Sequence, residues 1–379
     1  MSLPAHILRQ LETPRVVVDH ARLSANISRM ADLARAAGVA VRPHSKTHKC
    51  REIARMQLAA GAAGLTAAKT DEALVFIADG APSLTLAYPV LDPRKLDRLL
   101  KTAREQGCDL RMLADSEPGA TALAAAAERH AFDLPVFLKI DVGLHRCGLA
   151  PDAPGLLPLA RRIAESKRLR LAGILSHAGH AYGAKDATQG REVAREENRL
   201  MSAAAARLRG AGIEVPEISV GSTPTVLASD AWEGITEVRP GNYVFLDRTP
   251  LRLGLATLAD MALWVVATVV SANADWLIVD AGSKVLSSDG GGHGSTMDGY
   301  GLAFPLDAPE KMAHALTVRK LSEEHGFVER KDSQLGVGDV LRILPNHACP
   351  VANLADSLAI LHPDGALAQW PVAARGKTR

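Results

Sequence analysis

Short apolar runs alternate with helical patterns over the first two thirds of the chain. Eight of these runs have the length and composition of buried strands. They lie near Val39–Arg42, Gly64–Ala67, Ser83–Ala87, Leu110–Ala114, Val136–Asp141, Leu171–Ser176, Glu217–Gly221 and Thr236–Val238. Between them are Ala- and Leu-rich helical stretches such as Asp71–Asp79, Pro93–Gln106, Glu117–Arg129 and Arg191–Arg209. Eight βα alternations are what a (β/α)8 barrel needs, so we predict an α/β protein with a TIM-type barrel.

A doubly wound open sheet is the main alternative for the same alternation. In such a sheet a Gly-rich turn after an early strand would indicate a dinucleotide site. No Gly-x-Gly-x-x-Gly sequence follows an early strand here. The dinucleotide-binding version of the open sheet is therefore disfavoured.

The pattern changes after about Thr249. Strand-like runs at Leu263–Ser271, Trp276–Val279, Val340–Leu344 and Leu358–Leu361 are joined by turns rather than by long helices. This pattern predicts a mainly antiparallel β-domain. The run Val16–Asp19 is a ninth strand ahead of the barrel, and we expect it to join that domain. We therefore predict a barrel over 20–248 and a β-domain built from 1–19 and 249–379.

The amino-acid composition indicates which kinds of molecule the protein could bind and in which compartment it would fold. The chain has 379 residues, 47% of them hydrophobic, which is ample for a large core. Lys plus Arg is 44 and Asp plus Glu is 42, so neither a nucleic-acid nor a membrane partner is expected. The four cysteines are scattered, which argues against a disulfide framework. With no signal-peptide pattern and no apolar run of membrane-spanning length, we expect a cytoplasmic protein.

The segment from Val39 to Lys49 carries the strongest chemical signal. If its strand geometry continues, Arg42, His44, Lys46 and His48 share one face. Neighbouring cations disfavour a charged ammonium and would lower the pKa of Lys46. A lysine with a lowered pKa suits Schiff-base chemistry. The alternative interpretation is a basic surface loop at the end of a strand.

Further polar residues follow other predicted barrel strands. Arg146, His177, the turn 221–223 and Arg239 each come after one of them, as Lys46 does. Catalytic groups of barrels gather at the carboxyl ends of the strands, so these positions converge if the barrel prediction holds. An ion pair with Glu237 is the alternative role for Arg239.

Two small-residue turns could bind phosphate. Gly221-Ser-Thr-Pro-Thr225 offers hydroxyls and backbone donors before a predicted helix, and Pro240-Gly-Asn-Tyr243 could add donors because Gly241 permits close approach. The first turn is equally an ordinary helix N-cap with proline in the first turn. A third run, Gly290–Gly294, is better interpreted as a flexible loop than as a phosphate cradle, since no helix obviously follows it.

His347-x-Cys349 is a candidate metal element. A histidine and a cysteine two residues apart suit a divalent zinc ion if the chain is extended there. No further ligands have convincing spacing, so an ion with open positions fits better than a structural zinc site. The alternative is a buried thiol near an unrelated histidine.

Seven segments, in order along the chain, carry a family resemblance. They are Thr13–Asp19 with Arg42–Lys49, then Asp141–Gly148, Ser176–Tyr182, Val220–Thr225, Val238–Tyr243 and Pro345–Cys349. Together they resemble pyridoxal-phosphate enzymes of the alanine racemase fold type. More narrowly, they resemble the branch with D-serine dehydratase, D-threo-3-hydroxyaspartate dehydratase and D-threonine aldolase. The resemblance also implies that the first strand joins the C-terminal domain.

The resemblance implies roles for the residues of the site. Lys46 would carry pyridoxal 5'-phosphate, His177 would pack against its ring, Arg146 would lie near its phenolic oxygen and Arg239 would contact its ring nitrogen. Tyr182 would lie close to the substrate. The phosphate would be held by the two turns through Gly221, Ser222, Thr223, Gly241 and Asn242. We expect Lys46, His177 and Tyr182 to be catalytic; without the resemblance, His177, Arg146 and Tyr182 would be interpreted as structural.

The resemblance also implies a divalent ion, zinc or another such as manganese, on His347 and Cys349. Aldolase-like members typically have Asp in place of the cysteine, so Cys349 favours a dehydratase. We expect a D-serine dehydratase-like enzyme that converts a small 3-hydroxy D-amino acid to a keto acid and ammonia, pyruvate in the case of D-serine. The alternatives are retro-aldol cleavage to glycine and an aldehyde, a non-catalytic cofactor-binding protein, and a metal-free racemase. The family implies a homodimer.

Overall fold

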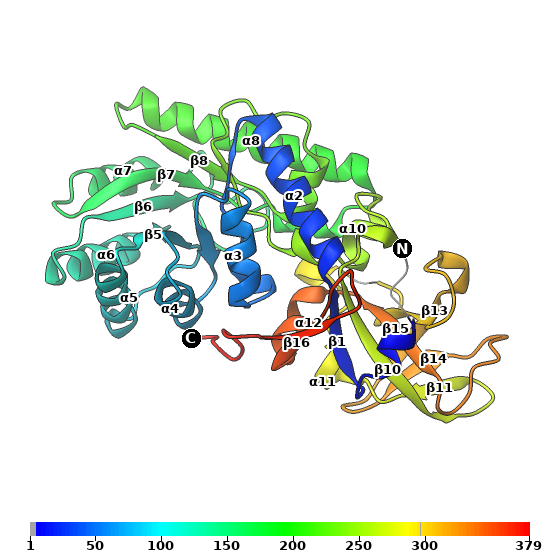
Figure 1. Ribbon diagram of the computed structural model, residues 1–379. Helices are drawn as coiled ribbons and strands as arrows, with labels where there is room; N and C mark the ends of the chain where they lie inside the picture. Colours follow the sequence, from blue (N-terminus) through cyan, green and yellow to red (C-terminus); the bar gives the residue numbers. More distant parts are fainter. Residues whose placement is uncertain (1–4, 296) are drawn as a thin grey trace.

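The computed structural model describes residues 5–295 and 297–379, and its first large element is a closed parallel sheet (Figure 1). The strand order is β2-β9-β8-β7-β6-β5-β4-β3. The strands are β2 Ala40–Val41, β3 Leu65–Ala67, β4 Ser83–Leu86, β5 Asp109–Ala114, β6 Leu134–Lys139, β7 Leu169–Leu175, β8 Glu217–Val220 and β9 Glu237–Val238. A parallel bridge between His44 and Thr66 joins the two ends of the order, and the Thr66 N–H donates to the Pro43 carbonyl at 2.8 Å. The predicted eight-stranded barrel is confirmed, and the open sheet is excluded.

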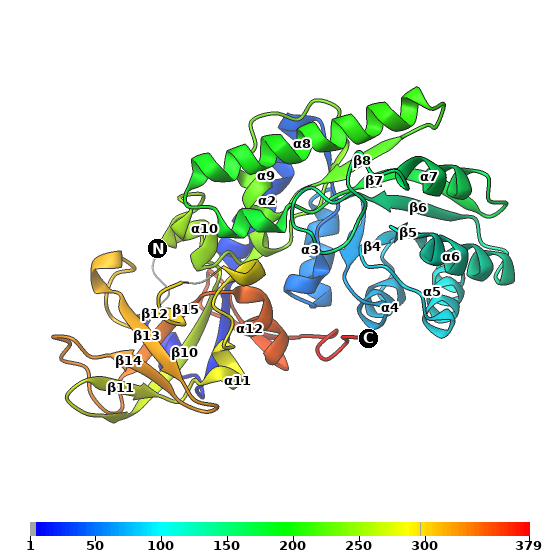
Figure 2. The ribbon, with the colours of Figure 1, turned by 180° about the vertical axis from the view of Figure 1, so that it is seen from behind.

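Helices form the outer layer of the barrel (Figure 2). They are α3 Arg51–Ala59, α4 Thr70–Ala78, α5 Pro93–Gln106, α6 Glu117–Arg129, α7 Leu156–Ala164, α8 Ala187–Gly210 and α9 Thr223–Ala228. The remaining position is filled by α2, His20–Ala37, which precedes β2 and is bound through Asn26 Nδ2 to the Val244 carbonyl at 3.2 Å. All four predicted helices are present.

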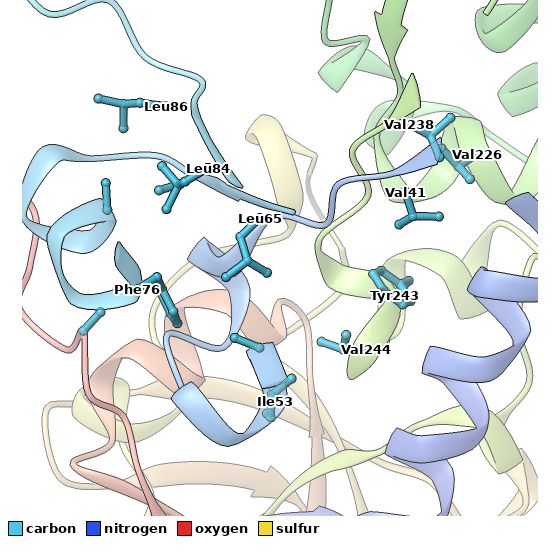
Figure 3. Close-up of a cluster of buried hydrophobic side chains, with 14 of the residues drawn as sticks. Val41, Ile53, Leu65, Phe76, Leu84, Leu86, Val226, Val238, Tyr243 and Val244 are labelled. Carbon is cyan, nitrogen blue, oxygen red and sulfur yellow. The ribbon is translucent and has the colours of Figure 1, made fainter. Parts of the chain in front are cut away.

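The apolar core lies between the strands and these helices. Val41 of β2, Val238 of β9 and Val226 of α9 lie close together, with Tyr243 beside them (Figure 3). All four side chains are buried. Full burial of an aliphatic side chain contributes about 1.5–3 kcal/mol, so such layers hold the barrel rigid beneath its loops.

The second sheet belongs to the C-terminal part of the chain and includes the first strand. Its strands are β1 Arg15–Asp19, β10 Leu263–Ala272, β11 Trp276–Val279, β12 Gly301–Pro305, β13 Leu316–Leu321, β14 Gly326–Glu329, β15 Val340–Pro345, β16 Ser357–Leu361 and β17 Leu367–Pro371. The order is β11-β14-β13-β12-β15-β10-β1-β16-β17, and β11 also pairs with β10, which closes six strands on themselves. The predicted antiparallel β-domain is confirmed, as is the placement of the first strand.

The first strand is nevertheless an exception to the antiparallel pattern. It pairs antiparallel with β10, where Val17 lies opposite Trp264, but parallel with β16, where Val17 lies opposite Ala359. The domain limits stay a prediction. The one between 248 and 249 falls inside α10, Arg248–Arg252, and residues 1–4 lie outside the described part of the chain.

The remaining elements are short. They are α1 Ala5–Leu8, α11 Ser283–Leu286, α12 Ala348–Leu354 and the 3-10 turns η1 Ser45–Thr47, η2 Gly179–Gly183, η3 Asn242–Val244, η4 Leu258–Asp260, η5 Gly292–Gly294 and η6 Met312–His314. Among the described residues, no helix is both long and apolar enough to cross a membrane. All four cysteines are free thiols.

An ion pair is buried inside the barrel. Arg42 Nε donates to Glu237 Oε2 at 2.7 Å, and Arg42 Nη1 donates to Ser83 Oγ at 2.7 Å. The other oxygen of Glu237 accepts from Ser219 Oγ at 2.5 Å. Both charged side chains are almost fully buried. Glu237 therefore pairs with Arg42, which is the arginine that the sequence analysis placed beside Lys46.

We expect Arg42→Met to destabilise the protein by about 3–5 kcal/mol, because it leaves the Glu237 carboxylate buried without its partner. Urea unfolding followed by far-UV circular dichroism measures this. Arg35→Ala is the matched control, since Arg35 forms an exposed pair with Asp32 and its loss should cost about 0.5 kcal/mol or less. A free energy of unfolding for Arg42→Met within about 1 kcal/mol of the wild-type value would contradict this account.

Candidate active site

Lys46 lies on a turn that follows the first barrel strand. The chain leaves β2 at Val41 and bends into η1, where Lys46 is the middle residue. Two contacts hold this turn: Ser45 Oγ donates to Glu72 Oε1 at 2.6 Å, and Asn353 Nδ2 donates to the Lys46 carbonyl at 3.1 Å. The turn is thus fixed by the barrel from below and by α12 of the β-domain from the side.

The expectation that Arg42, His44, Lys46 and His48 share one face is wrong. The strand ends before Lys46, and η1 breaks the alternation of side chains. The Arg42 guanidinium points into the barrel interior, where it bonds Glu237. The buried His48 ring contacts the Cys50 backbone at 3.1 Å.

The electrostatic surroundings of Lys46 nevertheless match the predicted direction. Burial lowers the pKa of Lys46, and Arg146 and Arg239 lower it further, whereas Cys349 and Glu72 raise it. The cations that disfavour a charged Lys46 thus come from later barrel strands and not from its own segment. The surface-loop alternative is disfavoured because the turn is packed between two domains.

Arg239 follows β9 and lies in the barrel mouth. Its Nη1 donates to Ser219 Oγ at 2.5 Å, its Nη2 donates to the Ser176 carbonyl, and its buried Nε has no partner among the described residues. Burial lowers the pKa of Arg239 to about 10, so the guanidinium stays charged at neutral pH. Ser219 lies between Arg239 and Glu237, so the two do not form a direct ion pair. The unused Nε–H of Arg239 is therefore available to a ligand.

His177, Tyr182 and Arg146 come from two loops at the same end of the barrel. His177 follows β7, and Tyr182 is buried in η2, where its hydroxyl lies close to Thr223. Burial and the nearby charge of Lys46 hold the pKa of His177 well below its usual value, so its ring is neutral. Arg146 is exposed, yet it is close enough to influence the pKa of both Lys46 and His177. The structure therefore brings all three near Lys46.

The two predicted phosphate turns lie next to each other. Ser222 caps α9, accepting from the Thr225 N–H at 3.4 Å, and the Tyr243 N–H donates to Thr223 Oγ1 at 3.2 Å, which joins the two turns. The capping interpretation of the first turn is thus correct as far as Ser222 is concerned. The Gly221 N–H donates to the buried Glu197 carboxylate at 3.3 Å.

The second turn approaches the Lys46 turn closely. A Cβ on Gly241 would lie 2.8 Å from Thr47 Oγ1 and 3.0 Å from His44 Cβ. Asn242 donates to Asp247 Oδ2 at 2.7 Å, while its Oδ1 is buried with no partner among the described residues. Only a residue without a side chain fits at 241.

We expect Gly241→Ala to weaken cofactor affinity by about 10- to 100-fold, since overpacking by one methyl group costs about 1–3 kcal/mol and would push the two turns apart. Titration of the apoprotein with pyridoxal phosphate, followed by visible absorbance, gives the dissociation constant. Gly210→Ala is the control, because its added Cβ would meet nothing within 4 Å. Equal affinities for the two variants would show that Gly241 has no role in the site.

His347 and Cys349 follow β15 and lie against the Lys46 turn. His347 precedes α12 with an extended backbone, and Cys349 stands in the first turn of that helix. The two side chains lie close enough for Cys349 to raise the pKa of His347, and Cys349 Sγ lies 3.3 Å from Thr47 Oγ1. The expectation of an extended chain through both residues is therefore wrong at Cys349, because the helix brings the thiol back toward the imidazole.

A carboxylate fixes the orientation of the His347 ring. Asp289 Oδ2 lies 2.9 Å from His347 Nδ1, which leaves Nε2 free to bind an ion. Burial lowers the pKa of His347, but Cys349, Asp289 and Asp247 together raise it, to about 11. No group of three or more His, Cys, Asp or Glu side chains within the described ranges could enclose a metal ion. The pair suits an ion that keeps open positions.

Sequence reasoning missed four residues that the structure brings to this site. They are Glu72, Lys139, Glu197 and His293. Burial lowers the pKa of Lys139 to about 7, and Arg239 acts in the same direction. His293, in the run interpreted as a flexible loop, has its Nε2 3.1 Å from His177 Nε2. Lys139 could have been selected from the sequence, because it stands at the carboxyl end of a predicted barrel strand. No pattern in the sequence pointed to His293, because its contact with His177 depends on how the two domains pack.

The residues present fit the cofactor and the ion that the resemblance implies. Lys46 offers an amine, Gly241 lets its turn approach the Lys46 turn closely, and Arg239 Nε and Asn242 Oδ1 are unpartnered in the described parts. His347 and Cys349 form a nitrogen and sulfur donor pair.

Comparison with known proteins decides the family. A family model described as "Alanine racemase, N-terminal domain" matches residues 18–249, and one described as "Putative serine dehydratase domain" matches residues 262–361. The chain belongs to the alanine racemase-type pyridoxal-phosphate enzymes. It is a lyase of the branch that contains D-3-hydroxy amino acid dehydratases and aldolases.

Several relatives of this pyridoxal-phosphate enzyme match along nearly the whole chain. D-threo-3-hydroxyaspartate dehydratase from Delftia sp. is 38% identical, covering 96% of this chain and 97% of its own, and D-threonine aldolase from Arthrobacter sp. is 32% identical, covering 99% and 96%. D-serine dehydratase from Dictyostelium discoideum is 28% identical, covering 94% and 95%.

Solved structures agree with this assignment. The Delftia dehydratase has a TM-score of 0.89 and 36% identity, with 96% of this chain and 98% of that chain covered. Structures similar to this enzyme also include two variants of a D-threo-3-hydroxyaspartate dehydratase. One has a histidine replaced by alanine, and the other has a cysteine replaced by alanine and is in a metal-free form; the two substituted positions are two residues apart. That spacing is the spacing of His347 and Cys349.

Proposed function

We propose that this enzyme is a pyridoxal-phosphate- and divalent-metal-dependent dehydratase of small 3-hydroxy D-amino acids. The observation that carries the proposal is the contact between the two predicted elements. Cys349 Sγ lies 3.3 Å from Thr47 Oγ1, and Asn353 of the same helix bonds the Lys46 carbonyl at 3.1 Å. The Lys46 turn and the proposed metal-binding pair are therefore packed against each other, so one substrate could place its amine at Lys46 and its β-hydroxyl at the ion.

The residues divide the work. The bound cofactor would supply the electron sink that makes the α-hydrogen acidic, and an ion on His347 and Cys349 would make the β-hydroxyl a better leaving group. The Lys46 amine would hold the cofactor and, when free, would accept the α-proton of the substrate. Arg239, whose Nε has no partner among the described residues, would face the ring nitrogen and would not give up a proton to it, so that nitrogen would stay unprotonated. His177 and Tyr182 would line the site, and the turns at 221–223 and 241–242 would hold the phosphate.

Elimination of water would give an enamine product that hydrolyses to a keto acid and ammonia. Cys349 supports this outcome over aldol cleavage, because the family resemblance implies a cysteine at this position in dehydratase-like members and an aspartate in aldolase-like members. The second candidate is retro-aldol cleavage to glycine and an aldehyde, which the 32% identity to a D-threonine aldolase favours. The His347 and Cys349 pair disfavours a non-catalytic cofactor carrier and a metal-free racemase.

An assay of the purified, cofactor- and zinc-loaded protein tests the proposal. The substrates are D-serine, D-threonine, D-threo-3-hydroxyaspartate and L-serine, and both product classes are measured: keto acid with ammonia, and aldehyde with glycine. We expect keto acid and ammonia from at least one D-substrate and about 100-fold less from L-serine, since only one enantiomer can present its α-hydrogen to Lys46 while its hydroxyl reaches the metal. Aldehyde and glycine as the main products would establish the aldolase instead.

We also propose a homodimer, on the strength of the family. Sedimentation equilibrium of the 40.1 kDa chain distinguishes a dimer from a monomer directly.

A further inference from the structure

His293 reaches the barrel from the other domain. It lies on η5, in the loop that follows α11, and its Nε2 is 3.1 Å from Nε2 of His177. Its ring centroid is 4.9 Å from the rings of both His177 and Tyr182. Its backbone has a φ of 53°, in the left-handed region that a residue other than glycine rarely adopts. A residue held in such a conformation against two predicted site residues is a candidate for function.

Two glycines make this approach possible. A Cβ on Gly292 would lie 2.4 Å from the Tyr182 ring, and a Cβ on Gly179 would lie 2.9 Å from the His293 ring. One glycine belongs to the loop and the other to η2 of the barrel. Both sides of the contact are therefore shaped to bring His293 in, which an incidental loop contact would not require.

The same loop is hydrogen-bonded to the segment that carries the proposed metal ligands, His347 and Cys349. Asp289 Oδ2 bonds His347 Nδ1 at 2.9 Å, and Asp289 Oδ1 accepts from the Gly291 N–H at 3.4 Å. Asn346, next to His347, donates to the Gly290 carbonyl at 3.3 Å. Through these bonds, anything that fixes the His347 ring also fixes the loop that carries His293.

His293 lies near charged groups of both the barrel and the β-domain. Partial burial and the cations Lys46 and Arg146 lower its pKa, and His347 acts in the same direction. The ring is therefore neutral, with one N–H and one bare nitrogen. Because the two Nε2 atoms face each other, His177 and His293 must hold opposite tautomers, and either ring could exchange this contact for one with a hydroxyl.

We propose that His293 binds the β-hydroxyl of the substrate by a hydrogen bond and that metal binding at His347 fixes His293 in place through Asp289. The inference rests on the proposed function, because it assumes a 3-hydroxy amino acid. It adds a residue from the β-domain to a site otherwise built by the barrel and the metal element.

The first experiment separates hydrogen bonding from packing. His293→Gln keeps a hydrogen-bonding group of similar reach, and His293→Leu keeps the volume without it. We expect kcat/KM for the best D-substrate to fall about 100-fold in His293→Leu and at most about 10-fold in His293→Gln, with the visible cofactor band and the zinc content unchanged in both. His314→Ala is the control, since His314 is an exposed histidine on η6 of the same domain.

The second experiment needs no turnover. Amide hydrogen exchange of peptides covering residues 287–295 is measured in the cofactor-loaded protein with and without zinc. We expect zinc to slow exchange in this loop at least about threefold, and Asp289→Asn to abolish that protection and to weaken zinc binding by about 10- to 100-fold.

The outcomes are distinguishable. Equal kcat/KM for His293→Leu and the wild type would overturn the role of His293 while the proposed function stands. Loop exchange that ignores zinc would overturn the metal coupling. If no 3-hydroxy D-amino acid reacts with the wild-type enzyme, the proposed function fails and the hydroxyl contact fails with it, but the exchange experiment still decides whether the loop is coupled to the metal.

Discussion

Replacing Lys46 by alanine should lower turnover of every D-substrate by about 10,000-fold or more and remove the visible absorption of the bound cofactor. The amine of Lys46 serves both as the attachment point of the cofactor and as the base for the α-proton, so its loss combines two effects, of which proton transfer alone is worth about 100- to 10,000-fold. The turn around Lys46 is held by Glu72 and Asn353, and neither contact involves the Lys46 amine. The variant should therefore remain folded.

Borohydride reduction followed by peptide mass spectrometry locates the attachment directly. We expect the reduced cofactor on Lys46 in the wild type and on no lysine in Lys46→Ala. Lys69→Ala is the matched control: Lys69 follows the neighbouring strand β3 and stacks on the Tyr88 ring at 4.1 Å, and its loss should leave the label in place. Label on Lys49 or Lys69 in the wild-type protein would refute the assignment.

Cys349→Ala should abolish elimination while the protein keeps its cofactor. Removing the thiol leaves His347 as a single ligand, and loss of Lewis-acid assistance to the departing hydroxyl is worth several kcal/mol, which corresponds to about 1,000-fold or more in rate. The visible band should persist, since the groups expected to hold the cofactor lie on the barrel. Zinc added to chelator-treated wild type should restore turnover, whereas zinc added to the variant should not.

Cys108→Ala provides the control for this variant. Cys108 is a free thiol like Cys349, but it is buried and lies just before β5, away from the metal-binding pair. Its replacement should change neither the zinc content, measured by atomic absorption, nor the rate. Full activity of chelator-treated protein that holds no metal would rule out the proposed leaving-group role.

Much of the fold was predictable because strand and helix signals are local. Helix α5 begins and ends where predicted, since Asp92 caps it, Pro93 opens it and Gly107 ends it at a φ of 64°. Helix α8 begins at Ala187, earlier than the predicted Arg191, because the Asp186 side chain caps it and Gly190 is tolerated within it. The closed six-stranded arrangement of the β-domain could not be predicted, since pairing of β11 with both β14 and β10 depends on long-range packing.

The candidate site was predictable where one segment supplies the chemistry. Lys46, Arg239 and the pair at 347 and 349 could be selected by residue type and position, and the structure brings them together, although their roles remain predictions. The direction of the Arg42 and His48 side chains was not predictable, because a two-residue alternation does not show where a strand ends. His293 could not be found, since 116 residues separate it from His177 along the chain.

The placement of β1 has a consequence for synthesis of the chain. Val17 is made early, but its partner Trp264 on β10 emerges 247 residues later, and Ala359 on β16 later still. At a translation rate of about 5–20 residues per second, an apolar strand with both edges open would wait for about 12–50 s. Unpaired apolar strands are templates for association with other chains. We therefore expect the nascent protein to depend on chaperones that shield its first twenty residues until the last third has been made.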